Sequence, residues 1–308
     1  MIIVRRGRVS LRAKVARVGL RWFIRPRLDQ PTLKDERRAS RALDALIPRP
    51  PRSTRTIAVD AGGVKANWIV TPQSKEEHCV LFLHGGGYRT GSPSTYRHFT
   101  WRIASATGAR LLAIDYRLAP EHPFPAALDD AISSYRWLLA RGVDPRRLAV
   151  VGDSAGGGLA LALMLKLRDG GIPLPVAVVA LSPWTDLALT GAALKRNARA
   201  DPMLNADDVP RFAADYLGGS DPHNPYASPL YGDLRGLPPT LLHVGSDEIL
   251  LDDAVRMARK LQRANCYVEL EIWPKMPHVW HAMAPFLPEA RFAIARIGTF
   301  VTKACRQN

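Results

Sequence analysis

Short apolar runs alternate with helical patterns along most of the chain, from about residue 55 onward. The first two runs, Thr56–Val59 and Ala66–Val70, lie on either side of a glycine pair and predict a hairpin. Six further runs predict strands at Cys79–Leu83, Arg110–Ile114, Leu148–Val151, Val176–Leu181, Thr240–Val244 and Tyr267–Ile272. Helical patterns lie between them at about Ala126–Arg141, Gly157–Arg168, Asp252–Arg263 and Glu289–Thr302. Because most of these strands are continuously apolar, they predict an α/β fold with a mostly parallel sheet covered by helices on both faces.

One stretch interrupts this alternation. Residues 187–225 contain four prolines and no strand pattern, and they include a predicted helix at Ala206–Tyr216. An insertion of this length between two strands is typical of a lid over a binding site. We therefore expect it to form part of a cap.

The first 28 residues predict a basic amphipathic helix. Leu11, Val15, Val18 and Trp22 recur at helical spacing, and eight arginines and one lysine precede the first acidic residue, Asp29. We expect the apolar stripe to pack on the domain and the arginines to face solvent. The alternative is weak contact with an anionic membrane surface. Nucleic acid is not expected as a partner, because the arginines lack interleaved aromatic residues.

Composition narrows the class of protein. The chain has 308 residues, a net charge of +15 and an ordinary hydrophobic fraction of 47%. No apolar stretch is long enough to span a bilayer, and the start of the sequence lacks the pattern of a secretion signal. The three cysteines, Cys79, Cys266 and Cys305, have neither metal-ligand nor disulfide spacing. We expect a cytoplasmic protein with reduced thiols and no metal site.

The most informative motif is Gly152-Asp-Ser-Ala-Gly156, which stands between a predicted strand and a predicted helix. A Gly-x-Ser-x-Gly turn in that setting holds the serine hydroxyl clear of the sheet edge. The glycines are required because a Cβ there would collide with the neighbouring strand and helix. Ser154 is therefore the candidate nucleophile, provided that a base and an oxyanion hole lie nearby.

The segment His84-Gly-Gly-Gly87 directly follows the strand that ends at Leu83. Successive glycines allow backbone N–H groups to point toward one position without obstruction by side chains. We expect oxyanion donors at Gly85 and Gly86, joined by Ala155 just after the serine. His84 is expected to orient the glycine loop.

The base and the orienting acid are expected at the same sheet edge. His278 lies in the loop after the last predicted strand, where catalytic groups of open α/β sheets gather, and we choose it as the base over His281, three residues on. In chain order the acid falls between serine and histidine. Asp247 ends the strand that begins at Thr240, and we choose it over Glu248, which we expect to point away. Asp252 and Asp253 are interpreted as the N-cap region of the next helix.

Taken together, these segments resemble the hormone-sensitive-lipase-like carboxylesterases, the bacterial family IV of lipolytic enzymes. The matching motifs are His84–Gly87, Asp115–Pro125, Gly152–Gly157, Gly236–Pro239 and Met276–His278, in the same order and spacing. The acid motif reads Asp247-Glu-Ile-Leu250 in this chain, where many members of the family have Asp-Pro-Leu. The resemblance implies an eight-stranded α/β-hydrolase core at 55–186 and 226–308, with a helical cap from 1–54 and 187–225. It also implies hydrolysis of short- to medium-chain acyl esters without a cofactor, and an analogy with dimers formed through the last strand.

Residues of the insertion and of the strand end before it are candidates for an acyl pocket, or equally for the core of the cap: Trp184, Met203, Leu204, Phe212, Tyr216 and Leu217. Two other functions stay open. A non-catalytic small-molecule receptor on the same fold is disfavoured because serine, aspartate and histidine are all present. An amide, thioester or lactone is the alternative to an ester, because a Ser-His-Asp triad attacks all of these carbonyls.

Overall fold

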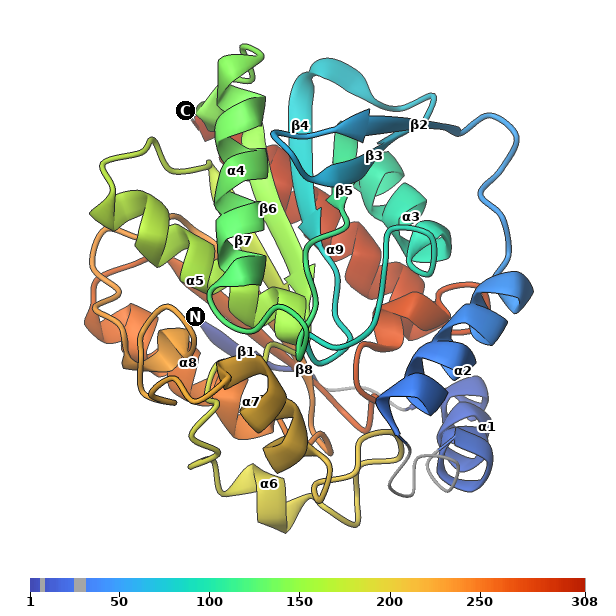
Figure 1. Ribbon diagram of the computed structural model, residues 1–308. Coiled ribbons are helices and arrows are strands. Elements are labelled where there is room, and N and C mark those ends of the chain that lie inside the picture. The colour runs from blue at the N-terminus through green and yellow to red at the C-terminus, as the bar shows by residue number, and fades with distance from the viewer. Residues whose placement is uncertain (6–8, 25–31, 308) are drawn as a thin grey trace.

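The computed structural model describes residues 1–5, 9–24 and 32–307, and its centre is a nine-stranded sheet in the order β1-β9-β8-β7-β6-β4-β5-β3-β2 (Figure 1). The strands are β1 (Ile2–Val4), β2 (Arg55–Asp60), β3 (Lys65–Val70), β4 (Lys75–Leu83), β5 (Ala109–Ile114), β6 (Leu148–Asp153), β7 (Ala177–Leu181), β8 (Thr240–Gly245) and β9 (Val268–Trp273). The β2–β3 and β3–β5 pairs are antiparallel, and every other pair is parallel. The predicted α/β sheet, mostly parallel and opened by a hairpin, is confirmed.

The ninth strand, β1, is a correction to the predicted eight. It runs parallel to β9, with Ile2 opposite Leu270, in a segment that the sequence placed in a helix. Arg5 then holds the buried carboxylate of Glu271 through two hydrogen bonds of 2.8 and 2.9 Å. The edge of β9, where the family analogy places a dimer contact, is therefore occupied by β1.

Helices cover both faces of the sheet. They are α3 (Arg97–Thr107), α4 (Ala126–Ala140), α5 (Ala155–Asp169), α8 (Leu251–Arg263) and α9 (Pro288–Gln307). Helices α4, α5 and α8 pack on one face, and α3 and α9 pack on the other (Figure 1). Side chains of the parallel strands are buried from both sides, which explains why their sequence is continuously apolar.

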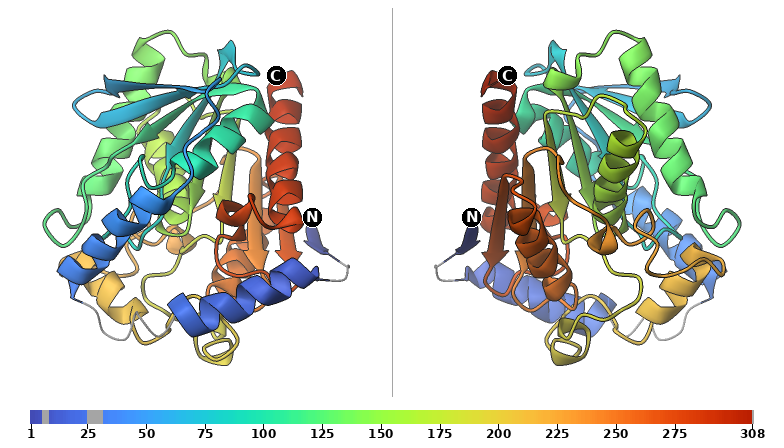
Figure 2. Two further views of the ribbon diagram at one scale, coloured as in Figure 1. Left: turned by 90° about the vertical axis from the view of Figure 1, so that its right-hand side faces the viewer. Right: turned by 90° about the vertical axis from the view of Figure 1, so that its left-hand side faces the viewer.

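The remaining helices gather at one end of the sheet, as the two views of Figure 2 show. They are α1 (Leu11–Gly19) with the π-helical turn Leu20–Ile24, α2 (Leu33–Leu46), α6 (Ala193–Arg196) and α7 (Val209–Leu217). The helix expected at 206–216 is thus α7, three residues shorter at its start. Short 3₁₀ turns complete the structure at Pro145–Arg147, Pro229–Tyr231 and Trp280–Met283.

Helix α1 faces the opposite way from the prediction. Its inner side carries the buried Ala13 and also Arg17, which bonds with Asp247. The apolar stripe faces solvent, with exposed fractions of 76, 64, 57 and 70% for Leu11, Val15, Val18 and Trp22. Residues 6–8 and 25–28 of the predicted helix lie outside the described residues.

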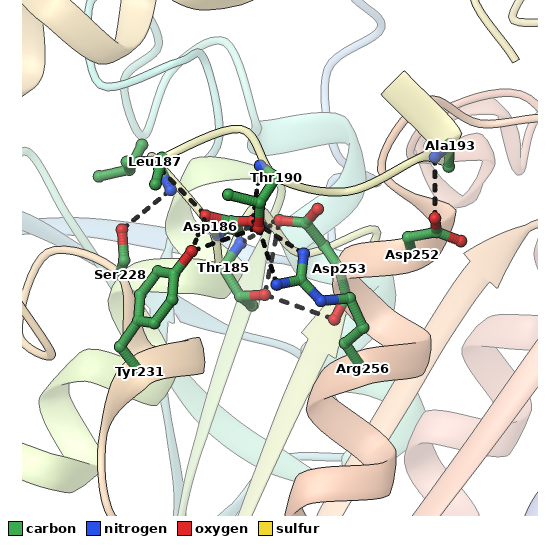
Figure 3. A network of polar contacts seen from close by, with 11 residues as sticks. Thr185, Asp186, Leu187, Thr190, Ala193, Ser228, Tyr231, Asp252, Asp253 and Arg256 are labelled. Carbon is green, nitrogen blue, oxygen red and sulfur yellow. Dashed lines mark hydrogen bonds and ion pairs between the residues drawn. The ribbon is translucent and has the colours of Figure 1, made fainter. Parts of the chain in front are cut away.

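A buried polar network fixes the place where the insertion leaves the core (Figure 3). Asp253, in the first turn of α8, accepts hydrogen bonds from the backbone N–H groups of Thr185 and Asp186 at 2.7 and 3.0 Å. The Asp186 carboxylate in turn bonds with Arg256 at 2.8 Å and with Tyr231 at 2.9 Å. Asp253 therefore anchors the start of the insertion and does not cap its own helix.

Within the described ranges, no helix is both long enough and apolar enough to cross a bilayer.

Candidate active site

Ser154 stands at the sharp turn between β6 and α5. Its φ of 53° lies in the left-handed region, which L-residues rarely adopt. The two glycines of the motif allow this turn to pack tightly. A Cβ on Gly152 would lie 2.1 Å from the Gly156 carbonyl oxygen, and one on Gly156 would lie 2.1 Å from that of Leu83. The partly exposed serine side chain is thus presented at the carboxyl end of the sheet, as predicted.

His278 lies directly against this serine. Its Nε2 is 2.8 Å from Ser154 Oγ, and its Nδ1 is 2.8 Å from Glu248 Oε2. The histidine sits in the loop after β9, and Val279 beside it has a left-handed backbone with φ 47°. Of the two candidate histidines, the structure brings His278, which the sequence favoured, to the serine.

The acid beside His278 is Glu248, so the choice of Asp247 is wrong. Asp247 turns away from the histidine: its Oδ2 accepts from Arg17 at 2.7 Å and its Oδ1 from Ser246 at 2.8 Å. The two acids are adjacent in a tight turn, and their side chains therefore diverge. The side that faces the sheet belongs to Glu248, which is fully buried.

Three donors surround the Glu248 carboxylate. Its Oε1 accepts from Ser182 Oγ at 2.8 Å and from the Gly245 N–H at 2.5 Å, while Oε2 faces His278. Ser182 also accepts a hydrogen bond from the Val279 N–H at 3.2 Å. A carboxylate with its acceptor sites filled is tolerated in a buried position.

These contacts set the charge of the histidine. Burial acts to lower the pKa of His278, but the hydrogen bond that the ring donates to Glu248, together with the negative charge of that carboxylate, outweighs burial, and the pKa is raised from 6.5. A histidine held this way accepts a proton readily. The geometry is that of an imidazole and a carboxylate placed to act as a base toward the serine hydroxyl.

Sequence reasoning rejected Glu248 in favour of Asp247 and did not identify Ser182. Both follow strand ends at the correct sheet edge, β8 and β7, and that position is a usable signal. The signal does not decide between Asp247 and Glu248, because it places both residues in one turn.

The structure contradicts one of the three predicted oxyanion donors, and the other two stay predictions. The Gly85 N–H donates to Asp153 Oδ1 at 3.0 Å, so its proposed role is wrong. Gly86 and Gly87 follow in a left-handed backbone with φ of 113° and 62°. Ala155 begins α5, where the first N–H groups have no partner within the helix.

The carboxyl behind the glycine loop is unusual. Asp153 is buried, and burial raises its pKa to about 7 against the opposing effect of its hydrogen bond with Tyr96. Asp153 links the turn that carries Ser154 to the glycine loop, because it directly precedes Ser154 and accepts a hydrogen bond from the Gly85 N–H.

Two further histidines are structural neighbours of the site. His84 places Nδ1 2.8 Å from the Gly85 carbonyl oxygen and stacks on Tyr116, and burial lowers its pKa to about 4. His281 turns to His243, with 3.0 Å between Nε2 and Nδ1, and does not reach the serine in the structure.

The candidate acyl-pocket residues fall into two groups. Trp184, Tyr216 and Leu217 are at most 6% exposed and belong to the core. Phe212 is half-buried, and its ring carbon Cδ2 would lie 3.1 Å from a Cβ built on Gly87. Met203 and Leu204 are also half-buried and follow Asp201, whose carboxylate accepts from both backbone N–H groups.

No cluster of three or more His, Cys, Asp or Glu side chains in the described ranges is arranged to hold a metal ion.

Comparison with known proteins decides the family. A family model described as alpha/beta hydrolase fold matches residues 80–282. An acetyl-hydrolase of Streptomyces hygroscopicus is 46% identical over 80% of this chain and 82% of its own length. The crystal structure of an esterase from the bacterial hormone-sensitive lipase family matches with a TM-score of 0.91 and 45% identity, over 97% of this chain and 100% of that one. The chain belongs to the hormone-sensitive-lipase-like esterases of the α/β-hydrolase fold.

A second similar structure comes from a crystal that was soaked with an ester. The crystal structure of EstE5 soaked with p-nitrophenyl butyrate matches with a TM-score of 0.92 and 40% identity, over 96% of this chain and 99% of that chain. The match extends over nearly the whole length of both chains.

Proposed function

We propose that this esterase hydrolyses short- to medium-chain acyl esters through a Ser154–His278–Glu248 triad and an acyl-enzyme intermediate. The observation that carries the proposal is the unbroken chain of two 2.8 Å hydrogen bonds from the serine hydroxyl through the imidazole to the buried carboxylate. That arrangement activates a hydroxyl that is otherwise a poor nucleophile.

The proposed reaction has two halves. His278 Nε2 takes the Ser154 proton while Oγ attacks the ester carbonyl, and Glu248 stabilises the imidazolium that forms. The imidazolium then protonates the leaving alcohol, which leaves the acyl group on Ser154. Water attacks this acyl-enzyme with His278 again as base, and the acid product departs.

The developing oxyanion is assigned to the backbone N–H groups of Gly86, Gly87 and Ala155. Gly87 replaces Gly85 in this set because the Gly85 N–H already donates to Asp153. Fixed backbone dipoles stabilise the transition state without reorganisation, and one such donor typically contributes about 3–4 kcal/mol.

We assign the acyl chain to the insertion at residues 187–225. This insertion and the part of residues 1–54 that follows β1 would form the cap over the core segments 55–186 and 226–308. Phe212, Met203 and Leu204 are the proposed contacts, since they are half-buried and Phe212 lies over the glycine loop. Trp184, Tyr216 and Leu217 support this wall from within the core. The butyrate ester soaked into EstE5 is of the size that we propose.

A series of p-nitrophenyl esters tests the proposal, with acetate, butyrate, octanoate and palmitate as acyl groups. We expect the highest kcat/KM on the shorter chains and loss of activity in Ser154→Ala. Intact-mass measurement after treatment with phenylmethylsulfonyl fluoride is expected to show one adduct on the wild type and none on the variant. A folded wild type without activity or adduct would favour the receptor hypothesis, and activity on thioesters or lactones alone would change the substrate class.

A further inference from the structure

Helix α1 presents its apolar side to solvent. We call Leu11, Val15, Val18 and Trp22 the docking stripe. All four are more than half exposed, in a molecule whose other long apolar side chains are mostly buried. The opposite side of α1 carries Ala13, which is fully buried, so the direction of the stripe is fixed by packing.

Cations flank the stripe. Arg12 and Lys14 of α1 and Arg21 of the following turn are exposed on either side of it. The surrounding segment is strongly basic, with eight arginines and one lysine before Asp29. An apolar ridge containing a tryptophan and bordered by Arg and Lys is the pattern of a helix that lies in a lipid–water interface.

The packed side of α1 is tied to the catalytic loops. Arg17 donates to Asp247 at 2.7 Å, in the turn that carries Glu248, and to the Lys275 carbonyl oxygen at 2.7 Å, in the loop that carries His278. Helix α1 therefore lies at the end of the sheet where Ser154 is presented (Figure 2).

We propose that α1 and the turn after it dock the protein on an anionic membrane surface through the docking stripe. Lipid headgroups of negative charge pair with Arg12 and Lys14, while the stripe enters the boundary between headgroups and acyl chains. A second copy of the chain is a less favoured partner for the docking stripe. A two-fold contact through the stripe would bring the same cations of both copies together.

Flotation with vesicles tests the proposal without any substrate, so it is independent of the proposed reaction. Vesicles of equal parts phosphatidylglycerol and phosphatidylcholine are expected to carry the wild type upward, and pure phosphatidylcholine vesicles much less. Val15→Ser/Val18→Ser is expected to reduce the bound fraction about tenfold. Arg12→Gln/Lys14→Gln is expected to reduce it and to weaken its dependence on salt.

Ile57→Ser is the matched control, because Ile57 is 47% exposed on β2, at the far end of the sheet (Figure 1). It is expected to float like the wild type, and all variants are expected to hydrolyse soluble esters at the wild-type rate. The proposal is overturned if the wild type does not float with anionic vesicles, or if Val15→Ser/Val18→Ser floats equally well. Gel filtration that shows a wild-type dimer and a monomeric Val15→Ser/Val18→Ser would assign the stripe to a second copy.

Discussion

Glu248 Oε2 lies 2.8 Å from His278 Nδ1, and the two side chains are 0% and 4% exposed. A pair so well shielded from water fixes both the orientation of the ring and its tautomer, because a carboxylate only accepts. The proton on Nδ1 leaves Nε2 free to accept from Ser154.

Replacing each acid by its amide tests whether Glu248 or Asp247 supports His278. In Glu248→Gln the oxygen keeps its contacts with Ser182 and Gly245, and the amide N–H₂ donates to Nδ1. The histidine then carries its proton on Nε2, where it cannot act as base, and kcat is expected to fall about 10³–10⁴-fold. Asp247→Asn is the matched control and is expected to lose less than about tenfold. Steady-state kinetics on p-nitrophenyl butyrate measures both losses. A larger loss in Asp247→Asn than in Glu248→Gln would mean that Asp247, and not Glu248, is the acid that supports His278.

The pH profile reports the charge on His278. Because its pKa is raised from 6.5, the imidazole is protonated and inactive as a base below a pH somewhat above that value. We expect the acid limb of kcat/KM to have its midpoint above 6.5. In Glu248→Gln the carboxylate is gone and burial remains, so the midpoint of the residual activity is expected at lower pH. An identical midpoint in the two proteins would mean that another group controls this limb.

Ser182 is expected to act on catalysis through Glu248. Ser182→Ala removes one donor to the carboxylate and the acceptor of the Val279 N–H. The loss of a hydrogen bond to a charged group is expected to lower kcat about 10–100-fold with little change in KM. The less stabilised carboxylate attracts the His278 proton more strongly, so the acid limb is expected to move to higher pH.

Ser134→Ala controls for the loss of a buried hydroxyl, since Ser134 Oγ is buried without a hydrogen-bond partner in the structure. Equal losses of activity in the two serine variants, with no shift of the acid limb in Ser182→Ala, would reduce Ser182 to an ordinary packing residue.

Asp153 is expected to make stability depend on pH. Its pKa rises from 3.8 in the unfolded chain to about 7 when folded. The folded protein therefore holds the proton more tightly, and this contribution to stability is complete below pH 3.8 and is lost as pH rises toward 7. In Asp153→Asn the fall in the free energy of unfolding between about pH 5 and pH 8 is expected to be smaller by about 2–3 kcal/mol. Urea unfolding at the two pH values measures this, and equal falls would assign the dependence elsewhere.

The sheet was predictable because its strands are buried on both faces. Continuous runs such as Val176–Leu181 leave few alternatives to a parallel strand, and the structure differs there by one residue. Strand β1 was not predictable in the same way, since Ile2–Val4 is too short to show a period and is defined by its pairing with β9. The prediction of which side of α1 packs on the protein was also wrong. An amphipathic pattern alone does not say which side is packed, and here Ala13 and Arg17 face the protein.

At the site, backbone motifs carried more information than side-chain chemistry. The turn around Ser154 demands glycines at fixed offsets, and His278 follows a strand end, so both positions were accessible from the sequence. The choice between Asp247 and Glu248 depends on which way one tight turn faces. The donor role of Gly85 depends on a contact with Asp153, from a strand that is distant in sequence. Such contacts exist only after the sheet has assembled.

The contact between Arg17 and Asp247 joins positions 230 residues apart in the chain. Residues that share such a contact tend to change together over evolution. Among relatives of this esterase, replacement of the arginine on the first helix is therefore expected to accompany loss of the acid at position 247, while the acid at position 248 is retained through both changes. The two adjacent carboxylates would then be conserved for different reasons, Asp247 for its contact with helix α1 and Glu248 for its contact with His278.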